Sequence, residues 1–527
     1  MSERNPDYDE LLVVNPLPWE RKVSGAVSKY VVEARGAPDD HLSARHWQDR
    51  EINDEAFVLP PVEVPGFGYR VVSQEVLLPD EEWPYSGTAV VETDRYRLTF
   101  DREHGGIVSW YDRNLDCEWI DDDEYSLGGF VIEQLVERDH DRPRDLLFRA
   151  PELGPDNPGG LWNAAPEIVE SKMDDSVSES PPNGVSIPTQ EWGYQMDWNG
   201  IRRGPEAVIR HRVYRTPQGY EVVQHLDVTG IPTPVELRFR IPKHGPGLTV
   251  DAQWEMPRDT HPTSTYLTFP FDLPDPTPRV DVGDQAMEPG TDQLQASCHD
   301  YYTAQRWVDL AGEDRGVTVA CPINPMVQFG DFSFGDAATE IDIDRALLLG
   351  WVTTNFYNTN FRAHQPGTVR SRYHLNPYRG EFDEARAHRV GRNAEHERPL
   401  VQPLAESTTD AGTLRTDGQF LDLPSPPVLV PQLRPAGDAG SIFPPTGVDE
   451  STDSGDGRHQ IDLSVLNASD EPQTATIDSA LLPIIDVEVA DLFGDGTTTA
   501  EPTLDDGTVS VVLAPRQLLT LHLDCRR

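Results

Sequence analysis

Residues 207–254 read AVIRHRVYRTPQGYEVVQHLDVTGIPTPVELRFRIPKHGPGLTVDAQW, and they show the strand pattern of this chain most clearly. It holds four short runs rich in Val, Ile, Leu, Tyr and Phe: Ala207–Tyr214, Glu221–Val228, Val235–Ile241 and Leu248–Trp254. Several of these runs alternate apolar with polar residues, which is typical of half-buried β-strands. Turn residues separate them at close spacing, so the stretch predicts antiparallel strands of a β-sandwich.

The same pattern extends along the chain on both sides. Its 47 prolines and 40 glycines interrupt the sequence too often for long helices. Further predicted strands are Tyr96–Phe100, Gln460–Asn467, Ile485–Leu492 and Thr508–Leu513. We expect Val509–Val512 and Leu518–Leu523 to form a terminal hairpin around Ala514-Pro515-Arg516. One short helix is predicted from Glu381 to about Arg392, and Ser425–Asp456, dense in Pro, Gly and Asp, is predicted to be loop.

A chain of 527 residues exceeds the size of a single hydrophobic core, which stops growing at roughly 250–300 residues. We divide it into an opening β segment at 1–84, a large β-sandwich at 85–380, a short helix and linker at 381–412, and a terminal β-sandwich at 413–527. The linker includes the polar run Glu406–Gly412.

Acidic residues dominate the composition. Asp and Glu number 90 against 44 Lys and Arg, which gives a net charge of -46, and the only lysines are Lys22, Lys29, Lys172 and Lys243. A field this negative repels nucleic acid and anionic membranes, so neither is an expected partner. The charge is spread along the chain and is not confined to a tail, which is the composition of proteins from extreme halophiles.

The four cysteines form no C-x-x-C pair, so they are expected to be buried apolar residues and not ligands of a zinc ribbon. The apolar run Leu11–Val14 is too short for a signal peptide or a membrane span, and the cytoplasm is the expected location. The sequon Asn467-Ala468-Ser469 therefore reads as a chance occurrence.

The usual short catalytic motifs are missing. There is no G-x-S-x-G, H-E-x-x-H, Walker loop or strand-linked G-x-G-x-x-G in the sequence. Two H-x-D triplets occur, at His225–Asp227 and His522–Asp524, and on a strand their first and third side chains share one face. Zinc needs three or four ligands, and no second ligand pair accompanies either triplet, so the structural interpretation is favoured for both.

Aromatic side chains cluster with polar ones in one segment. Between Asn355 and Gln365, the rings of Phe356, Tyr357 and Phe361 interleave with side chains that can bind hydroxyl groups. Flat rings stack on the apolar faces of sugars while Asn, Gln and Arg bind the hydroxyls. For most rings of this chain, core packing is the favoured interpretation. The candidate carbohydrate-binding residues are Tyr357, Asn358, Asn360, Gln365, Arg306 and Trp307.

Several phrases, in order, resemble the β-rich region of family 38 α-mannosidases. They include Val13–Arg21 (VVNPLPWER), Val64–Arg70 (VPGFGYR), Gly105–Asp112 (GGIVSWYD), Gln305–Leu310 (QRWVDL) and Thr354–Phe361 (TNFYNTNF). The resemblance covers nearly the whole chain. It implies a mainly β fold, with a large antiparallel sandwich of the galactose-mutarotase-like kind and a smaller terminal sandwich.

The resemblance also implies where the chemistry lies. In this family a β/α domain precedes the β-rich region and supplies zinc, a nucleophile and a general acid. Here the β-rich region begins at Leu11, so no catalytic or metal-binding residue is carried over to this chain. We expect a separate catalytic β/α subunit that holds zinc, no cofactor in this chain itself, and a mannose-containing carbohydrate as the substrate.

Three functions remain open from the sequence. The chain is the β-sandwich half of a split α-mannosidase-type glycoside hydrolase, or a stand-alone, non-catalytic carbohydrate-binding protein, or a relic without activity. A neighbouring gene for a β/α zinc domain would favour the first.

Overall fold

The computed structural model describes residues 10–28, 56–79, 84–120, 124–135, 200–258, 263–294, 297–333, 341, 343–355, 365–404, 415–423, 426–436, 458–490 and 500–526. The chain forms two compact units. Unit 1 combines Met1–Glu82 with Glu384–Arg527, and unit 2 is Trp83–Asp383. Among the described residues, no helix has the length and apolar character needed to cross a membrane.

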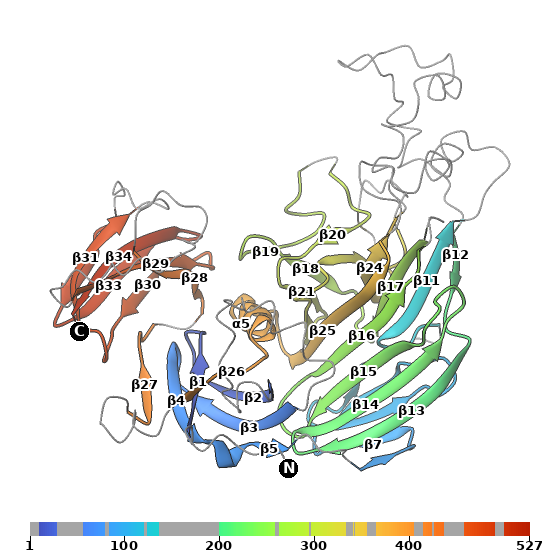
Figure 1. Cartoon of the computed structure of the whole chain (residues 1–527). Helices are drawn as coiled ribbons and strands as arrows, with labels where there is room; N and C mark the ends of the chain where they lie inside the picture. The colour runs from blue at the N-terminus through green and yellow to red at the C-terminus, as the bar shows by residue number, and fades with distance from the viewer. Residues whose placement is uncertain are drawn as a thin grey trace, which may run out of the picture. The chain divides into compact units, whose positions relative to one another are not determined.

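A ten-stranded antiparallel sheet dominates unit 2 (Figure 1). Its strands, in spatial order, are β19 (Ala286–Met287), β18 (Thr277–Asp281), β21 (Trp307–Ala311), β22 (Arg315–Ala320), β25 (Gly367–Arg379), β16 (Leu248–Met256), β15 (Val235–Pro242), β14 (Gly219–Asp227), β13 (Ala207–Thr216) and β6 (Tyr85–Ser86). The four strands predicted between residues 207 and 254 are therefore confirmed as the neighbours β13 to β16.

Two further antiparallel sheets complete unit 2. One has the order β12 (Gly200–Arg203), β11 (Gly129–Leu135), β17 (Thr263–Phe271), β24 (Ala346–Thr354), β23 (Met326–Phe329) and β20 (Tyr302–Thr303). The other has the order β10 (Cys117–Glu118), β9 (Ile107–Asp112), β8 (Tyr96–Phe100) and β7 (Val90–Glu92).

The core of unit 2 lies between these sheets, and strict alternation along the strands creates it. On β15, Val235, Leu237, Phe239 and Ile241 are buried and the residues between them are half-exposed. Phe239 packs edge-on against Phe100 of β8, with ring centroids 5.3 Å apart, so the ten-stranded and four-stranded sheets share this core. Burial of each large apolar side chain contributes about 1.5–3 kcal/mol, and the alternation leaves the opposite face of β15 polar.

In unit 1, the opening segment pairs with chain far along the sequence. One sheet has the order β26 (Leu400–Leu404), β1 (Glu10–Asn15), β4 (Gly68–Ser73) and β27 (Asp417–Gln419), and a second has the order β2 (Arg21–Ser28), β3 (Ala56–Val64) and β5 (Leu78–Pro79). A short 3-10 helix, η1 (Gln74–Val76), follows β4. The proposed divisions at 84 and 380 fall close to the unit boundaries, but the pairing of β1 with β26 joins the opening segment to the terminal part.

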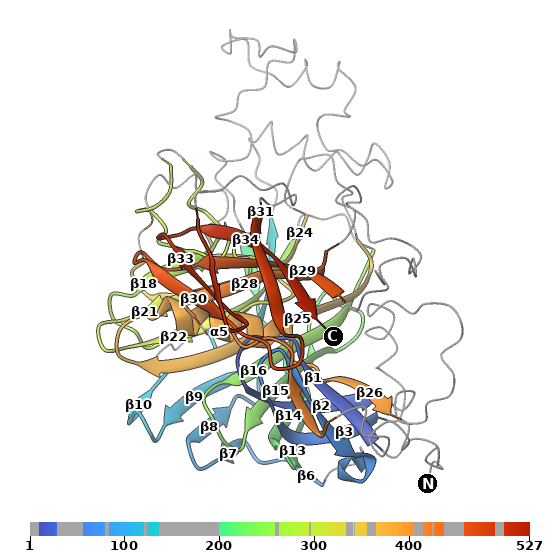
Figure 2. The ribbon, with the colours of Figure 1, turned by 90° about the vertical axis from the view of Figure 1, so that its left-hand side faces the viewer.

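The terminal sandwich of unit 1 has two sheets (Figure 2). They have the orders β28 (Val428–Pro435), β29 (Arg458–Asn467), β34 (Leu518–Arg526), β31 (Ile484–Ala490), and β30 (Gln473–Ile477), β33 (Thr508–Leu513), β32 (Thr503–Asp505). Leu463, Val509 and Leu521 are among the fully buried residues between the two sheets.

The structure corrects three details of the sequence prediction. The expected terminal hairpin is wrong, because β33 pairs with β30 and β32 whereas β34 pairs with β29 and β31. The chain between them crosses from one sheet to the other, so both strands bury an apolar face in the shared core. The predicted loop at Ser425–Asp456 contains strand β28, and the predicted helix begins three residues later than expected, as α5 (Glu384–Glu395).

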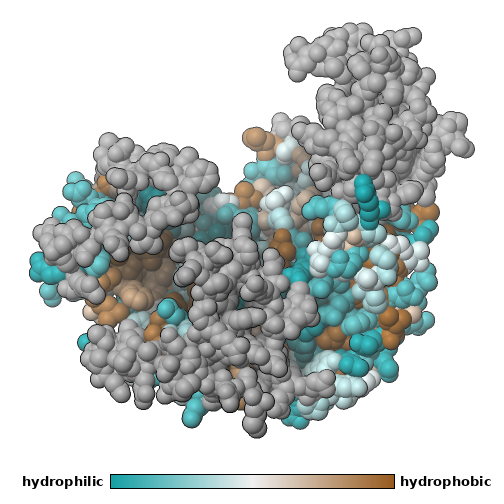
Figure 3. Space-filling model, viewed as in Figure 1, coloured by the Kyte–Doolittle hydropathy of each residue, from teal (hydrophilic) through white to brown (hydrophobic). Residues whose placement is uncertain are grey.

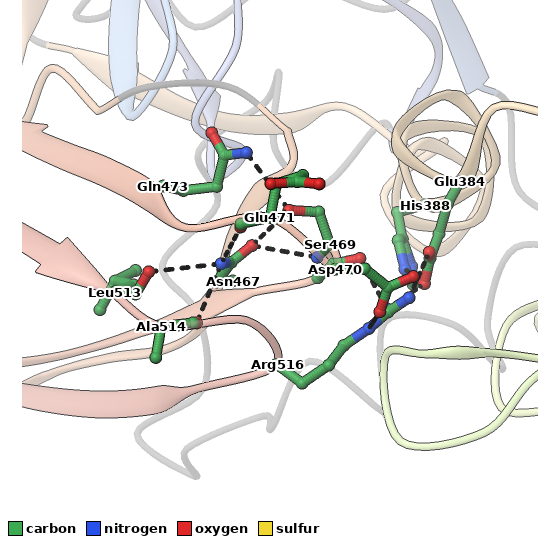
Figure 4. Close-up of polar contacts among 11 residues, drawn as sticks. Glu384, His388, Asn467, Ser469, Asp470, Glu471, Gln473, Leu513, Ala514 and Arg516 are labelled. Atoms are coloured by element: carbon green, nitrogen blue, oxygen red, sulfur yellow. Dashed lines mark hydrogen bonds and ion pairs between the residues drawn. The ribbon is translucent and has the colours of Figure 1, made fainter.

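Asn467 organises the crossing between β33 and β34 (Figure 4). Its side-chain amide donates to the carbonyls of Glu471 at 2.8 Å and Ala514 at 2.9 Å, and its Oδ1 accepts from the Ser469 amide at 3.0 Å. The residue is fully buried. Asn467 therefore has a structural role, in which its buried side chain joins the end of β29 to the crossing.

The mainly β, antiparallel fold predicted from the sequence is confirmed, with a large sandwich and a smaller terminal one. Three of the cysteines, Cys117, Cys321 and Cys525, are buried and unpaired, as predicted, whereas Cys298 is unpaired but only half-buried.

Candidate functional site

Polar side chains occupy one face of the ten-stranded sheet in three rows across four strands. The register aligns them as Glu221–Arg240–Thr249–His374, Val223–Arg238–Asp251–Arg372 and His225–Glu236–Gln253–Arg370, in the order β14, β15, β16 and β25. We call the eleven polar residues of these rows the polar face; the twelfth position holds the buried Val223. Because side chains alternate between the faces of a strand, the same alternation that builds the core places all of them together.

Asp251 is the central acceptor of the polar face. Arg372 on one neighbouring strand donates from Nε to Oδ1 at 2.6 Å, and Arg240 on the other neighbouring strand donates to Oδ2. Burial alone would raise the pKa of Asp251, but the two guanidinium groups outweigh it and lower the pKa below its ordinary value. Asp251 is therefore ionised at neutral pH and holds two cations in place.

Arg238 forms a second centre, with two carboxylates. Its Nη1 lies 2.6 Å from Glu221 Oε1, and its Nη2 lies 2.8 Å from Glu236 Oε1. About a third of the side-chain surface of Arg238 and of Glu236 is exposed, at 37% and 35%. The polar face therefore combines preorganised donors and acceptors that remain within reach of a ligand.

The two histidines of the polar face contact polar partners across strands. His225 Nε2 lies 3.4 Å from Glu236 Oε2, and His374 Nδ1 lies 3.1 Å from the Thr249 hydroxyl. Burial lowers the pKa of His225, and the attraction of Glu236 only partly opposes this. The other H-x-D triplet behaves similarly, because His522 Nδ1 contacts Asp462 Oδ1 across β29 and β34 at 2.9 Å. In each triplet the histidine thus contacts a carboxylate on a neighbouring strand.

A buried carboxylate lies in the six-stranded sheet. Glu133 on β11 accepts from Arg202 Nε at 2.9 Å and from the Tyr266 hydroxyl at 3.2 Å. Burial raises the pKa of Glu133, and Arg202 opposes the shift. Arg202 also lies over the ring of Phe332, with 4.3 Å between its Cζ and the ring centroid. Glu133, Arg202 and Tyr266 thus contact one another across β11, β12 and β17, and these contacts stabilise the arrangement of the three strands.

The sequence-predicted site residues fall into three places. Tyr357, Asn358 and Asn360 lie outside the described residues. Gln365 is exposed, two residues before β25. Arg306 and Trp307 lie at the start of β21: Arg306 Nη1 is 2.9 Å from Asp284 Oδ1, and Trp307 is fully buried with its ring 5.8 Å from that of Phe382.

Trp307 belongs to the same side of the sheet as the polar face. The register continues from His374 through Ala320 to Trp307 in one direction, and from Glu221 through Tyr214 to Tyr85 in the other. One row of side chains therefore runs from Tyr85 at the β6 edge to Trp307 on β21. Seven strand spacings of about 4.8 Å make this row roughly 34 Å long.

The residues of the polar face were not identified from the sequence. The sequence pattern that indicates a polar face occurs in Val235–Ile241, where Glu236, Arg238 and Arg240 alternate with apolar residues. Leu248–Trp254 holds one charged residue, Asp251, and only the register determines which of the arginines it meets. In Figure 3, teal and white atoms predominate on the part of unit 2 in view, with brown residues between them.

Comparisons with known proteins identify solved structures that share this fold. No family model matches the sequence, and no curated protein matches it. An α-mannosidase from Enterococcus faecalis V583 is similar in structure, with a TM-score of 0.55 and 10% identity over 98% of this chain and 56% of that one. A protein in glycosyl hydrolase family 38 from Enterococcus faecalis is similar at a TM-score of 0.53, with 10% identity over 98% of this chain and 58% of that one.

These likenesses show the fold. The chain has a family 38-like fold across nearly its whole length, and it spans a little over half the length of the two solved structures. A galactose mutarotase related enzyme from Lactobacillus acidophilus matches 56% of the chain at a TM-score of 0.27, a likeness too distant to support an argument.

Proposed function

We propose that this chain is a carbohydrate-metabolism protein, the β-sandwich half of an α-mannosidase-type glycoside hydrolase. It acts with a separate catalytic β/α subunit on a mannose-containing carbohydrate. The observation that supports this most strongly is the structural match over 98% of the chain to an α-mannosidase of which it covers 56%. The phrases VVNPLPWER at Val13–Arg21 and QRWVDL at Gln305–Leu310 support the same assignment from the sequence.

The proposed division of labour assigns the zinc, the nucleophile and the general acid to the catalytic subunit. This chain contributes a rigid scaffold and polar side chains. The half-exposed carboxylates and arginines of the polar face suit hydroxyl groups, because a carboxylate accepts hydrogen bonds and a guanidinium donates them in a fixed fork. Among the described ion pairs of the polar face, Arg238 and Glu236 have the most exposed side chains.

Co-purification from the native source tests the proposal directly. We expect a β/α zinc protein to co-purify with this chain at equal stoichiometry. Permanent interfaces of this kind bury roughly 2,000 Å² or more. We expect aryl α-mannoside hydrolysis from the reconstituted pair and none from this chain alone, with or without added zinc. Turnover by the chain alone that disappears in His225→Ala or Asp227→Asn would instead assign catalysis to β14.

A stand-alone carbohydrate-binding protein is the second candidate, favoured by the interleaved rings and amides of Asn355–Gln365. In that case the chain purifies without a partner and binds mannosides unaided. Gln365→Ala and Tyr357→Ala should each weaken this binding, whereas Gln293→Ala, in a loop that is also part of unit 2, serves as the control. Binding that is equal in all three variants would remove this candidate.

A further inference from the structure

A buried glutamine on β14 holds the turn between β8 and β9 against the ten-stranded sheet. Gln224 is fully buried; its Oε1 accepts from the Gly106 amide at 2.8 Å, and its Nε2 donates to the Asp101 carbonyl at 2.7 Å. These two bonds fix the orientation of the side-chain amide, because the reverse orientation would oppose two donors at Gly106 and two acceptors at Asp101. Gln224 therefore joins the ten-stranded sheet to the four-stranded sheet in one orientation.

His211 of β13 completes this junction. It lies directly opposite Gln224 in the register, and its Nδ1 is 3.2 Å from Gln224 Nε2. Its Nε2 is 2.7 Å from the carbonyl of Thr88, which precedes β7. Because Gln224 Nε2 can only donate, Nδ1 of His211 accepts, and the one proton of the neutral ring lies on Nε2 and is donated to Thr88. The surroundings thus select one tautomer of the neutral imidazole.

A second proton on His211 has no acceptor. It would lie on Nδ1 and point at an N–H of Gln224, so that two donors would face each other. A flip of the Gln224 amide would offer its oxygen to His211, but it would also turn donors toward the Gly106 amide and remove the donor from the Asp101 carbonyl. A buried polar group without a partner costs free energy, so neither arrangement of a charged His211 keeps all the contacts of the junction.

The environment of His211 favours its neutral form. Burial lowers the pKa of His211, the hydrogen bond to the Thr88 carbonyl partly opposes this, and the positive charge of Arg102 adds to the lowering. The neighbours of His211 on its own strand, Arg210 and Arg212, pair with the polar-face side of β14 and so point away from the junction. Both carry positive charge and neither would stabilise an imidazolium.

The turn supplies the remaining charges near His211. Phe100 of β8 packs on the His211 ring, with 5.9 Å between the centroids, and is uncharged. The carboxylate of Asp101 accepts from the Glu103 amide at 2.7 Å and lies 3.4 Å from His104 Nδ1. In the part of the chain that the structure describes, no carboxylate pairs with His211. Protonation of His104 would strengthen its pair with Asp101 and tighten the turn, which is opposite in sign to the effect of a proton on His211.

We propose that His211, Gln224 and the turn Asp101–Gly106 form an acid-sensitive clasp. The clasp holds the four-stranded sheet to the ten-stranded sheet while His211 is neutral, and it opens when His211 takes up a proton. The unfolded chain binds this proton more readily than the folded one. The contribution of the clasp to stability is therefore complete above the ordinary pKa of 6.5, and it is lost as the pH falls from 6.5 through the lower pKa of the folded state. The inference does not depend on the proposed function.

Hydrogen exchange of the turn tests the clasp, at a salt concentration at which the chain is folded. The Gly106 amide donates to Gln224, so its protection, corrected for the intrinsic exchange rate, should fall about threefold to tenfold between about pH 7.5 and about pH 5.5. His211→Asn offers an acceptor near the position of Nδ1 and does not titrate, so its protection should be the same at both pH values. His104→Asn, in the same turn, is the matched control and should keep the fall.

Proton uptake by His211 can also be measured without a substitution. Exchange of the hydrogen on Cε1 of each histidine gives its pKa in the unaltered chain, and the pKa of His211 should lie below 6.5. The proposal is wrong if the Gly106 amide is equally protected at both pH values, if the fall persists in His211→Asn, or if it disappears in His104→Asn. If His211→Asn does not fold, a pKa of His211 at or above 6.5 in the unaltered chain would still overturn it.

Discussion

Arg516 binds both carboxylate oxygens of Glu384, the first residue of α5 (Figure 4). Its Nη1 lies 2.7 Å from Oε1 and its Nη2 lies 3.1 Å from Oε2. The same guanidinium donates from Nε to Asp470 at 3.0 Å and from Nη1 to the carbonyl of Ala468 at 2.7 Å. Hydrogen bonding to Glu384 raises the pKa of Arg516, so its guanidinium keeps its charge. One side chain thus ties α5 to the crossing between β33 and β34.

Replacement of Arg516 should destabilise unit 1. Arg516→Met keeps the aliphatic stem but removes four charge-assisted hydrogen bonds, and hydrogen bonds to charged groups contribute roughly 1.5–3 kcal/mol each at most. Because the groups share one side chain and are partly solvated, we expect the free energy of unfolding to fall by about 2–3 kcal/mol. Chemical denaturation measures it, and hydrogen exchange should show the loss of protection in β29 and β34.

The control for this experiment is Arg526→Met, at the exposed end of β34. It should change the free energy of unfolding by less than about 0.5 kcal/mol. Equal effects of the two substitutions would show that the contacts of Arg516 contribute nothing beyond its charge.

Asp251→Asn should destabilise unit 2 in a pH-dependent way. Two arginines lower the pKa of Asp251 below its ordinary value of 3.8, so its charge stabilises the fold fully above about that pH. The contribution disappears as the pH falls from there through the lower pKa of the folded state. We expect a loss of about 2 kcal/mol at neutral pH and a shrinking difference from the unaltered protein below pH 3.8.

Glu92→Gln is the control, because Glu92 is mostly exposed, at 57% of its side-chain surface, and pairs with Arg97 at 3.6 Å and with Arg113 at 3.2 Å. Exposed ion pairs contribute about 0–1 kcal/mol, so this variant should unfold almost like the unaltered chain. A difference between Asp251→Asn and the unaltered protein that stays constant down to pH 3 would contradict the role given to the Asp251 charge.

Asn467→Ala should weaken the terminal sandwich. The substitution removes the fully buried amide of Asn467, which donates to the carbonyls of the exposed residues Glu471 and Ala514. A hydrogen bond contributes about 0.5–1.5 kcal/mol net, so we expect the loss of both to cost about 2 kcal/mol. Ser469→Ala removes only the hydroxyl that donates to Asn467 Oδ1 at 2.8 Å, and it should cost clearly less. The reverse order in thermal unfolding would show that Asn467 is not the central residue of this turn.

Salt should stabilise the whole chain. With 90 acidic against 44 basic residues, like-charge repulsion acts on the compact state, and molar salt shortens the Debye length to about 3 Å. Salt also weakens ion pairs such as those of the polar face, but the unpaired acidic excess is larger. We therefore expect the melting temperature to rise steadily across a potassium chloride series. A melting temperature that is the same at low and at molar salt would contradict the interpretation of the acidic composition as halophilic.

The positions of many strands, and the fold class, follow from local sequence pattern. Alternation in Val235–Ile241 and in the runs around it is a local property, because a strand exposes alternate residues on opposite faces wherever it lies. For the same reason Tyr96–Phe100 and Thr508–Leu513 were predicted with the bounds that the structure shows.

The choice of partner for each strand is not local, and it is seen in the folded chain alone. β33 and β34 are separated by four residues, a spacing that favours a hairpin, yet they join different sheets because each has an apolar face to bury in the same core. The meeting of Asp251 with Arg240 and Arg372 joins residues up to 121 positions apart. Likewise, Tyr85 meets Tyr214 because an edge strand pairs with β13 across more than a hundred residues of intervening chain. Such contacts depend on long-range register, which the sum of burial over all strands determines and which no local stretch of sequence contains.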